Sequence, residues 1–160
     1  MKPIEATNKA AARLSGTAAS IIKDKGTTVH SVSPGDTVYA AVAKLKELQI
    51  GALLVMEGLE LVGIVSERDY ARKIILEGRA SKATLVSEIM STPVITVATT
   101  TPLIDCMQLM NERRIRHLPV MDGIRLVGLM SSGDLLRSMI VQQGETIDQL
   151  NTLITDPYPG

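Results

Sequence analysis

Aromatic side chains are scarce in this chain of 160 residues: they make up 2% of it, and there is no Phe and no Trp. The hydrophobic fraction is nevertheless 45%, so we expect a globular core built from Val, Ile, Leu, Ala and Met. Proteins that bind single-stranded nucleic acid normally stack bases on aromatic side chains. The composition therefore argues against nucleic acid as a partner.

Excess charge is also absent, because 17 basic residues balance 17 acidic ones. A neutral chain has no general attraction to nucleic acid or to anionic lipid. Cys106 is the single cysteine, which excludes an intramolecular disulfide and a multi-cysteine zinc site. The chain has two histidines, His30 and His117, and no set of cysteines that could complete a metal site with them. We therefore expect no metal cofactor.

Long apolar runs are absent as well. No run approaches the roughly 18 apolar residues that a membrane-spanning helix needs. Residues 1–13 also lack the apolar stretch of a secretory signal peptide. We therefore expect a cytoplasmic protein without a membrane partner.

The sequence contains two copies of one unit. When the chain is shifted against itself by 65 positions, the segment 61–63 (Leu-Val-Gly) falls on the identical segment 126–128, and Ser66 and Asp69 fall on Ser131 and Asp134. Such self-similarity is the signature of a duplicated structural unit. We expect the first unit at 17–78, a linker and the second unit at 79–142, a flexible or helical segment at 1–16 and a tail at 143–160.

Each copy has the pattern β-α-β-β-α, which predicts an α/β (α+β) fold. Asp36 or Thr37 is the expected N-cap of the first helix, and Gly51 is its expected end. The predicted elements are 29–32, 38–48, 52–56, 61–65 and 67–76 in the first copy, a short helix at 85–90, and 94–97, 103–113, 117–120, 126–130 and 133–142 in the second. The duplication predicts that the two units pack with pseudo-twofold symmetry.

Polar side chains that could bind a ligand lie where the third strand of each copy meets its last helix. Ser66 is followed by Asp69, and Ser131 by Asp134, in the first helical turn. A hydroxyl with free helix N–H groups suits a phosphate, and a carboxylate one turn later can accept hydrogen bonds from sugar hydroxyls. The same arrangement is also an ordinary helix-capping motif worth about 1 kcal/mol. The pattern alone leaves both interpretations open.

These junctions resemble the signature of the cystathionine-β-synthase (CBS) motif: glycine, two apolar residues, Ser or Thr, two variable residues and Asp. The strand segments 50–55 (Ile-Gly-Ala-Leu-Leu-Val) and 116–120 (Arg-His-Leu-Pro-Val) are similar to the family too, and the resemblance covers about residues 17–142. It implies a Bateman module, a pair of motifs with two clefts that bind adenosine compounds. AMP, ADP, ATP or NAD(H) is expected ahead of S-adenosylmethionine, with Asp on the ribose and Ser on a phosphate.

The resemblance implies a set of ligand-binding positions in both copies. They are Thr28, Val29, His30, Ala52, Val65, Ser66, Arg68, Asp69, Thr92, Val94, Arg116, His117, Leu118, Pro119, Met130, Ser131 and Asp134.

The two clefts are not expected to be equivalent, because Gly133 replaces Arg68 and cations are concentrated in the second copy. Arg116 lies at a strand entry, where a guanidinium can pair with phosphate. His117 is expected either to contact phosphate or to be packed in the interior. Arg113 and Arg114 fit a solvated helix end equally well. Cys106 is expected to be an inert core thiol.

The sequence favours a non-catalytic regulatory module that senses energy or redox state through an adenosine nucleotide. The implied assembly is a homodimer joined by the last helices of the motifs, acting on an unidentified protein partner. The apolar residues expected at that interface are Ile74, Ile75, Leu135, Leu136, Met139 and Ile140. The alternative is a ligand-free interaction scaffold in which Ser and Asp are only caps. No enzymatic activity is expected, since no nucleophile–base pair or phosphate-binding glycine loop is present.

Overall fold

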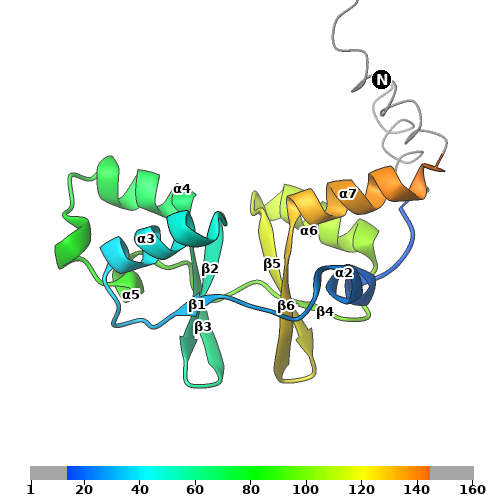
Figure 1. The fold of residues 1–160 in the computed structure, drawn as a ribbon, viewed down its shortest axis with the longest axis horizontal. Helices are drawn as coiled ribbons and strands as arrows, with labels where there is room; N and C mark the ends of the chain where they lie inside the picture. The colour runs from blue at the N-terminus through cyan, green and yellow to red at the C-terminus, as the bar shows by residue number, and fades with distance from the viewer. Residues whose placement is uncertain (1–13, 145–160) are drawn as a thin grey trace, which may run out of the picture. The chain divides into compact units, whose positions relative to one another are not determined.

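The computed structural model describes residues 14–144, which fold into two compact units (Figure 1). The first unit is Thr28–Ile95. The second unit combines the described residues up to Thr27 with those from Thr96 onward, so the segment that precedes the first motif belongs with the second. The expected N-terminal segment and C-terminal tail lie almost wholly outside the described residues.

The first unit is a three-stranded sheet covered by helices. Strand β1 pairs in parallel with β2, and β2 pairs antiparallel with β3. The elements in chain order are β1 (Ser31–Val32), α3 (Val38–Leu48), β2 (Ala52–Glu57), β3 (Glu60–Ser66), α4 (Glu67–Tyr70), the π-helix η1 (Ala71–Ile75), the 3₁₀ helix η2 (Ser81–Ala83) and α5 (Val86–Ile89).

The second unit repeats this arrangement, with sheet order β4-β5-β6. Its elements are α2 (Ala18–Lys25), β4 (Val97–Ala98), α6 (Leu103–Arg113), β5 (His117–Asp122), β6 (Arg125–Ser131) and α7 (Ser132–Gln142). Helix α2 packs against β6 and α7 although it precedes the whole first unit in the chain. Each unit therefore contains the predicted β-α-β-β-α order, and the mixed α+β class is confirmed.

The two sheets share their register down to the irregularities. Ala52 pairs with Ser66 in the first unit, and His117 pairs with Ser131 in the second. Each hairpin shifts register at the same repeat position, between Val55 and Met56 or between Val120 and Met121. The backbone that carries each Ser is thus the same in both copies.

Aliphatic side chains fill the cores, as the composition predicts. Leu53 and Leu118, which share a repeat position in the central strands, are both completely buried. Among the described residues, Tyr39 is half exposed and stacks under the ammonium of Lys82, so it adds little to the core. Cys106 is buried, and burial raises the pKa of its thiol to about 11, as expected of an inert core residue.

The first motif's long helix spans the predicted residues 38–48, but Gln49 and Ile50 terminate it rather than Gly51. Gln49 adopts the left-handed conformation with φ of 53°, and the Ile50 amide donates back to the Leu45 carbonyl at 3.1 Å. This is a Schellman-type end, in which an apolar residue after the cap packs on the core. Arg114 repeats the geometry in the second unit.

Both first strands are shorter than predicted. The strand expected at 29–32 covers Ser31–Val32, and the one expected at 94–97 covers Val97–Ala98. In the first unit the Leu54 amide still donates to the His30 carbonyl at 3.2 Å. Pro119 holds the corresponding position in β5 and has no N–H to donate, so β4 cannot extend in the same way.

The predicted final helices also differ in detail. The segment expected as one helix at 67–76 is divided into α4 and the π-helix η1. Ile74 and Leu135, both expected at a dimer interface, are 2% and 4% exposed and belong to the cores. Ile75 and Leu136 do face solvent, at 59% and 58%. Across residues 14–144, no helix combines the length and apolar character needed to cross a bilayer.

Candidate functional site

Each unit has a polar corner where its last strand meets the following helix. We call the Ser66–Asp69 junction with Lys73 the first corner, and the Ser131–Asp134 junction with Lys25 the second corner. The sequence forms the Ser–Asp pair of each corner locally, because a Ser at the strand end can cap a helix whose third residue is Asp. Both corners are complete capping boxes.

The first corner is closed by a lysine on its own helix. The Ser66 backbone N–H donates to Asp69 Oδ2 at 2.9 Å, and the Asp69 N–H donates to Ser66 Oγ at 3.2 Å. Lys73 Nζ lies 3.1 Å from Asp69 Oδ1 and also donates to the Ile89 carbonyl at 2.7 Å. Lys73 therefore joins Asp69 to the end of α5.

The second corner is closed by a lysine from α2. Ser131 N–H donates to Asp134 Oδ2 at 2.7 Å, and Lys25 Nζ approaches the same oxygen at 2.8 Å while donating to the Leu129 carbonyl at 2.9 Å. Arg137 pairs with Asp134 Oδ1. The Asp134 side chain is only 6% exposed, against 14% for Asp69.

The ionisation of Asp134 reflects this environment. Burial by itself would raise the pKa of Asp134, but hydrogen bonds from Lys25 and Ser131, together with the Lys25 charge, hold that pKa below its usual value. Asp134 is therefore a carboxylate at neutral pH, able to accept further hydrogen bonds.

Arg116 and His117 lie beside the second corner. The Ser132 N–H donates to the Arg116 carbonyl at 2.9 Å, just as Glu67 N–H donates to the Gly51 carbonyl at 3.1 Å in the first unit. Burial lowers the pKa of His117, and the charges of Lys25 and Arg116 lower it further, against an opposing effect of Asp134. His117 is thus a neutral imidazole at physiological pH.

Strand pairing brings some of the predicted ligand-binding residues together within each unit. In the first unit, Ala52 lies opposite Ser66, and Arg68 and Asp69 follow in α4. Thr28, Val29 and His30 lead into β1. In the second unit, four predicted residues meet at the corner: Arg116, His117, Ser131 and Asp134.

Other predicted residues lie elsewhere. Val65, Leu118, Pro119 and Met130 are buried in the sheets, so their side chains belong to the cores. Thr92 and Val94 lie in the first unit, between α5 and the start of β4. Their predicted part in ligand binding stays a prediction, as it does for the whole set.

Three corner residues are missing from the sequence-based set: Lys25, Lys73 and Arg137. Spacing could have indicated two of them, since Lys73 is four residues after Asp69 and Arg137 three after Asp134, which places each on the same helix face. Lys25 is 109 residues from Asp134, and only the docking of α2 on the second unit brings it there.

The corners supply hydrogen-bond acceptors, donors and cations. Among residues 14–144, no group of three or more His, Cys, Asp and Glu side chains could hold a metal ion. Each Asp serves its capping box and a lysine, an arrangement that suits recognition of vicinal hydroxyls and an adjacent anion.

Comparisons with known proteins identify the family of this chain. The chain is 39% identical over 153 residues to the mitochondrial CBS domain-containing protein CBSX3 of Arabidopsis thaliana, covering 90% of this chain and 74% of that protein. It is 50% identical to a CBS-domain protein of known structure from Burkholderia ambifaria, with a TM-score of 0.77 and coverage of 80% and 96%.

A further solved structure is CBSX2 in complex with AMP, which is 25% identical to this chain, with a TM-score of 0.65 and coverage of 79% of this chain and 98% of that one. The sequence profile of the CBS domain matches residues 22–76 and 86–141, one match for each repeat. This chain is therefore a member of the CBS-domain family, with two CBS motifs.

Proposed function

We propose that this protein is a non-catalytic regulatory module that binds an adenosine nucleotide through its two Ser–Asp corners. The observation that carries the proposal is the repetition of a largely buried carboxylate, a hydroxyl and a fixed lysine at the strand–helix junction of both units. AMP, ADP, ATP and NAD(H) are the proposed ligands, because all share the ribose and phosphate that these groups recognise.

The proposed roles follow from the chemistry of each group. Asp69 and Asp134 are carboxylates that would accept hydrogen bonds from ribose hydroxyls. Ser66 and Ser131, with the N–H groups of the helices they cap, would face a phosphate. The solved complex of CBSX2 with AMP supports this choice of ligand, because that protein shares the fold over most of the present chain.

The exposed apolar residues of the last helices support a proposed homodimer. Ile75 and Leu76, at the end of η1, are 59% and 79% exposed, and Leu136 and Val141 on α7 are 58% and 67% exposed. Such a dimer would transmit ligand binding to a partner protein.

A ligand-free interaction scaffold is the second candidate function, and one observation favours it. Both Ser–Asp pairs are complete capping boxes, and both carboxylates already have lysine partners. The corners therefore satisfy their own hydrogen bonds, and a ribose would have to displace or share one of these contacts.

Thermal unfolding in the presence of AMP, ADP, ATP, NAD, NADH and S-adenosylmethionine separates the two candidates. A ligand at about 100 times its dissociation constant adds roughly 2.7 kcal/mol to the unfolding free energy. We expect at least one adenosine nucleotide to raise the midpoint, and Asp134→Ala to reduce that rise. Asp122→Asn, on the exposed hairpin of the same unit, is the control and should respond like the wild type. No rise with any compound would favour the scaffold.

A further inference from the structure

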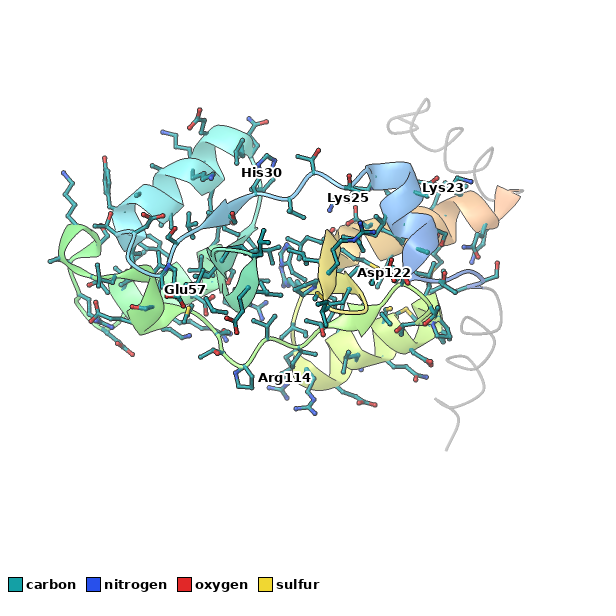
Figure 2. All side chains as sticks on the ribbon, turned by 90° about the horizontal axis from the view of Figure 1, so that it is seen from below. Lys23, Lys25, His30, Glu57, Arg114 and Asp122 are labelled. Atoms are coloured by element: carbon teal, nitrogen blue, oxygen red, sulfur yellow. The ribbon has the colours of Figure 1, made fainter. Side chains whose placement is uncertain are left out.

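The second corner contains a cation whose matching repeat position is occupied by an uncharged residue at the first corner. Lys25 is the last residue of α2 (Figure 2). Its ammonium is fixed by Asp134 Oδ2 at 2.8 Å and the Leu129 carbonyl at 2.9 Å. An ammonium has three N–H donors, so these two acceptors leave one donor. The Lys25 side chain is 42% exposed, which allows that donor to reach solvent or a bound anion.

The repeat makes Lys25 specific to this corner. Shifted by 65 positions, Lys25 corresponds to Met90, Arg116 to Gly51 and His117 to Ala52, so the first corner has no charge at these positions. The first turn of α4 carries two acidic residues, Glu67 and Asp69, whereas the first turn of α7 carries Asp134 alone. The two corners therefore offer different electrostatic environments to an anion.

Cations outnumber the carboxylate at the second corner. Lys25 and Arg137 both contact Asp134, and the backbone of Arg116 bonds to the first residue of α7. The Arg137 side chain is 71% exposed and only three residues from Asp134, so a ribose could displace it at little cost. Lys25 has a second, backbone acceptor that would hold it in place. A phosphate joined to a ribose at Asp134 would then have a fixed ammonium within reach.

We propose that Lys25 is the specificity-determining residue of the second corner, which makes it select phosphorylated adenosine compounds over the bare nucleoside. This inference rests on the proposed function and deepens it by naming the residue that would contact the phosphate. The competing role for Lys25 is purely structural, as an anchor that holds α2 on the second unit. An anchor would affect the binding of adenosine and AMP alike, whereas a phosphate contact would affect AMP alone.

The test is calorimetric titration of AMP and adenosine into the full chain and three variants. Lys25→Met introduces the residue found at the matching position of the first motif, Lys25→Arg retains the charge, and Lys23→Met makes the same charge change on an exposed residue of the same helix (Figure 2). Loss of one charge-assisted hydrogen bond should weaken AMP binding about tenfold in Lys25→Met, with adenosine nearly unchanged. Lys25→Arg should retain most of the selectivity, and Lys23→Met all of it.

The other outcomes would contradict either the role of Lys25 or the proposed function. An unchanged ratio of AMP to adenosine affinity in Lys25→Met overturns the role of Lys25 but leaves the proposed function standing. A wild type that binds neither compound removes both. If the wild type binds AMP but adenosine too weakly to measure, Lys25→Met must still weaken AMP binding about tenfold, and Lys25→Arg must retain most of it. An AMP affinity that is unchanged in Lys25→Met contradicts the inference in that case also.

Discussion

The first and second corners share a capping box but differ in the origin of the lysine that closes it. Lys73 comes from the same helical segment as Asp69, four residues later, whereas Lys25 comes from α2, 109 residues before Asp134. Duplication therefore preserved the backbone and the Ser–Asp pair while the neutralising cation changed its source.

This difference indicates how each corner is connected to its unit. Lys73 bonds outward to the Ile89 carbonyl of α5, and Lys25 bonds inward to the Leu129 carbonyl of β6. Lys73 links Asp69 to α5, which precedes the second motif in sequence. Lys25 is itself the last residue of α2, which precedes the first motif, and it links that helix to Asp134. A ligand that engages either Asp thus acts on a contact between separate parts of the fold.

The largest expected effect tests whether the two cores are equivalent. Leu53→Ala and Leu118→Ala remove fully buried leucines from the same repeat position. Each should lower the unfolding free energy by about 3 kcal/mol, because it leaves a cavity in a close-packed core. Urea unfolding of both variants measures this. Costs that differ by more than about 2 kcal/mol would show that the duplicated cores are not energetically alike.

The next effect should distinguish the two carboxylates. Asp134→Asn removes a carboxylate that is 6% exposed and has two cationic partners, and it should cost about 2 kcal/mol, whereas Asp69→Asn removes one that is 14% exposed with one lysine partner and should cost about 1 kcal/mol. Since the pKa of Asp134 is lowered in the folded state, its stabilisation is present at neutral pH and is lost as the pH falls below about 4.

Unfolding midpoints of the wild type and Asp134→Asn between neutral and acidic pH check this prediction. The difference in unfolding midpoint between the wild type and Asp134→Asn should become smaller as the pH falls. A gap that stays constant over this range would mean that the Asp134 charge contributes nothing to stability.

A glycine in each third strand provides the third comparison. A Cβ at Gly128 would collide with the Cδ1 atom of Ile22, and one at Gly63 would lie 2.5 Å from Met90 Sδ. A methionine side chain is unbranched and can move aside, while the branched Ile22 on α2 cannot do so easily. We expect Gly128→Ala to cost roughly 2 kcal/mol and Gly63→Ala about 1 kcal/mol, measured by denaturant unfolding. The reverse order would contradict the docking of α2 through Ile22.

The smallest effect concerns a cap that only the first unit has. Thr37 Oγ1 accepts a hydrogen bond from the Ala40 N–H at the start of α3, whereas Pro102 holds the matching position before α6 and provides no side-chain cap. Thr37→Ala should therefore cost about 1 kcal/mol, and Thr37→Ser should cost almost nothing. Thermal unfolding of the two variants gives the comparison, and equal losses would exclude capping as the cause.

The features that sequence predicts well are those encoded locally and repeated. The hairpins, the long helices and the Ser–Asp pairs follow from residues close together in the chain, and the duplication provides each observation twice. The helix α3 covers the predicted residues 38–48, but Gly51 is not its terminator, because the left-handed Gln49 and the amide of the apolar Ile50 close it first.

Long-range features could not be predicted in this way. Nothing near Lys25 in the sequence indicates Asp134 as its partner, because the ion pair depends on α2 joining the second unit. The burial of Ile74 and Leu135, as against the exposure of Ile75 and Leu136, depends equally on which helix face meets the sheet. Side-chain identity alone does not separate these adjacent apolar residues.

Calorimetric titration of AMP into the wild type and the double variant Asp69→Asn/Asp134→Asn tests the central claim most directly. The wild type should bind AMP, and the double variant should remain folded at neutral pH and lose at least about tenfold in affinity, since both ribose acceptors are altered. Asp122→Asn is the control and should bind like the wild type. No binding by the wild type, or equal binding by the folded double variant, would contradict nucleotide recognition at the two Ser–Asp corners.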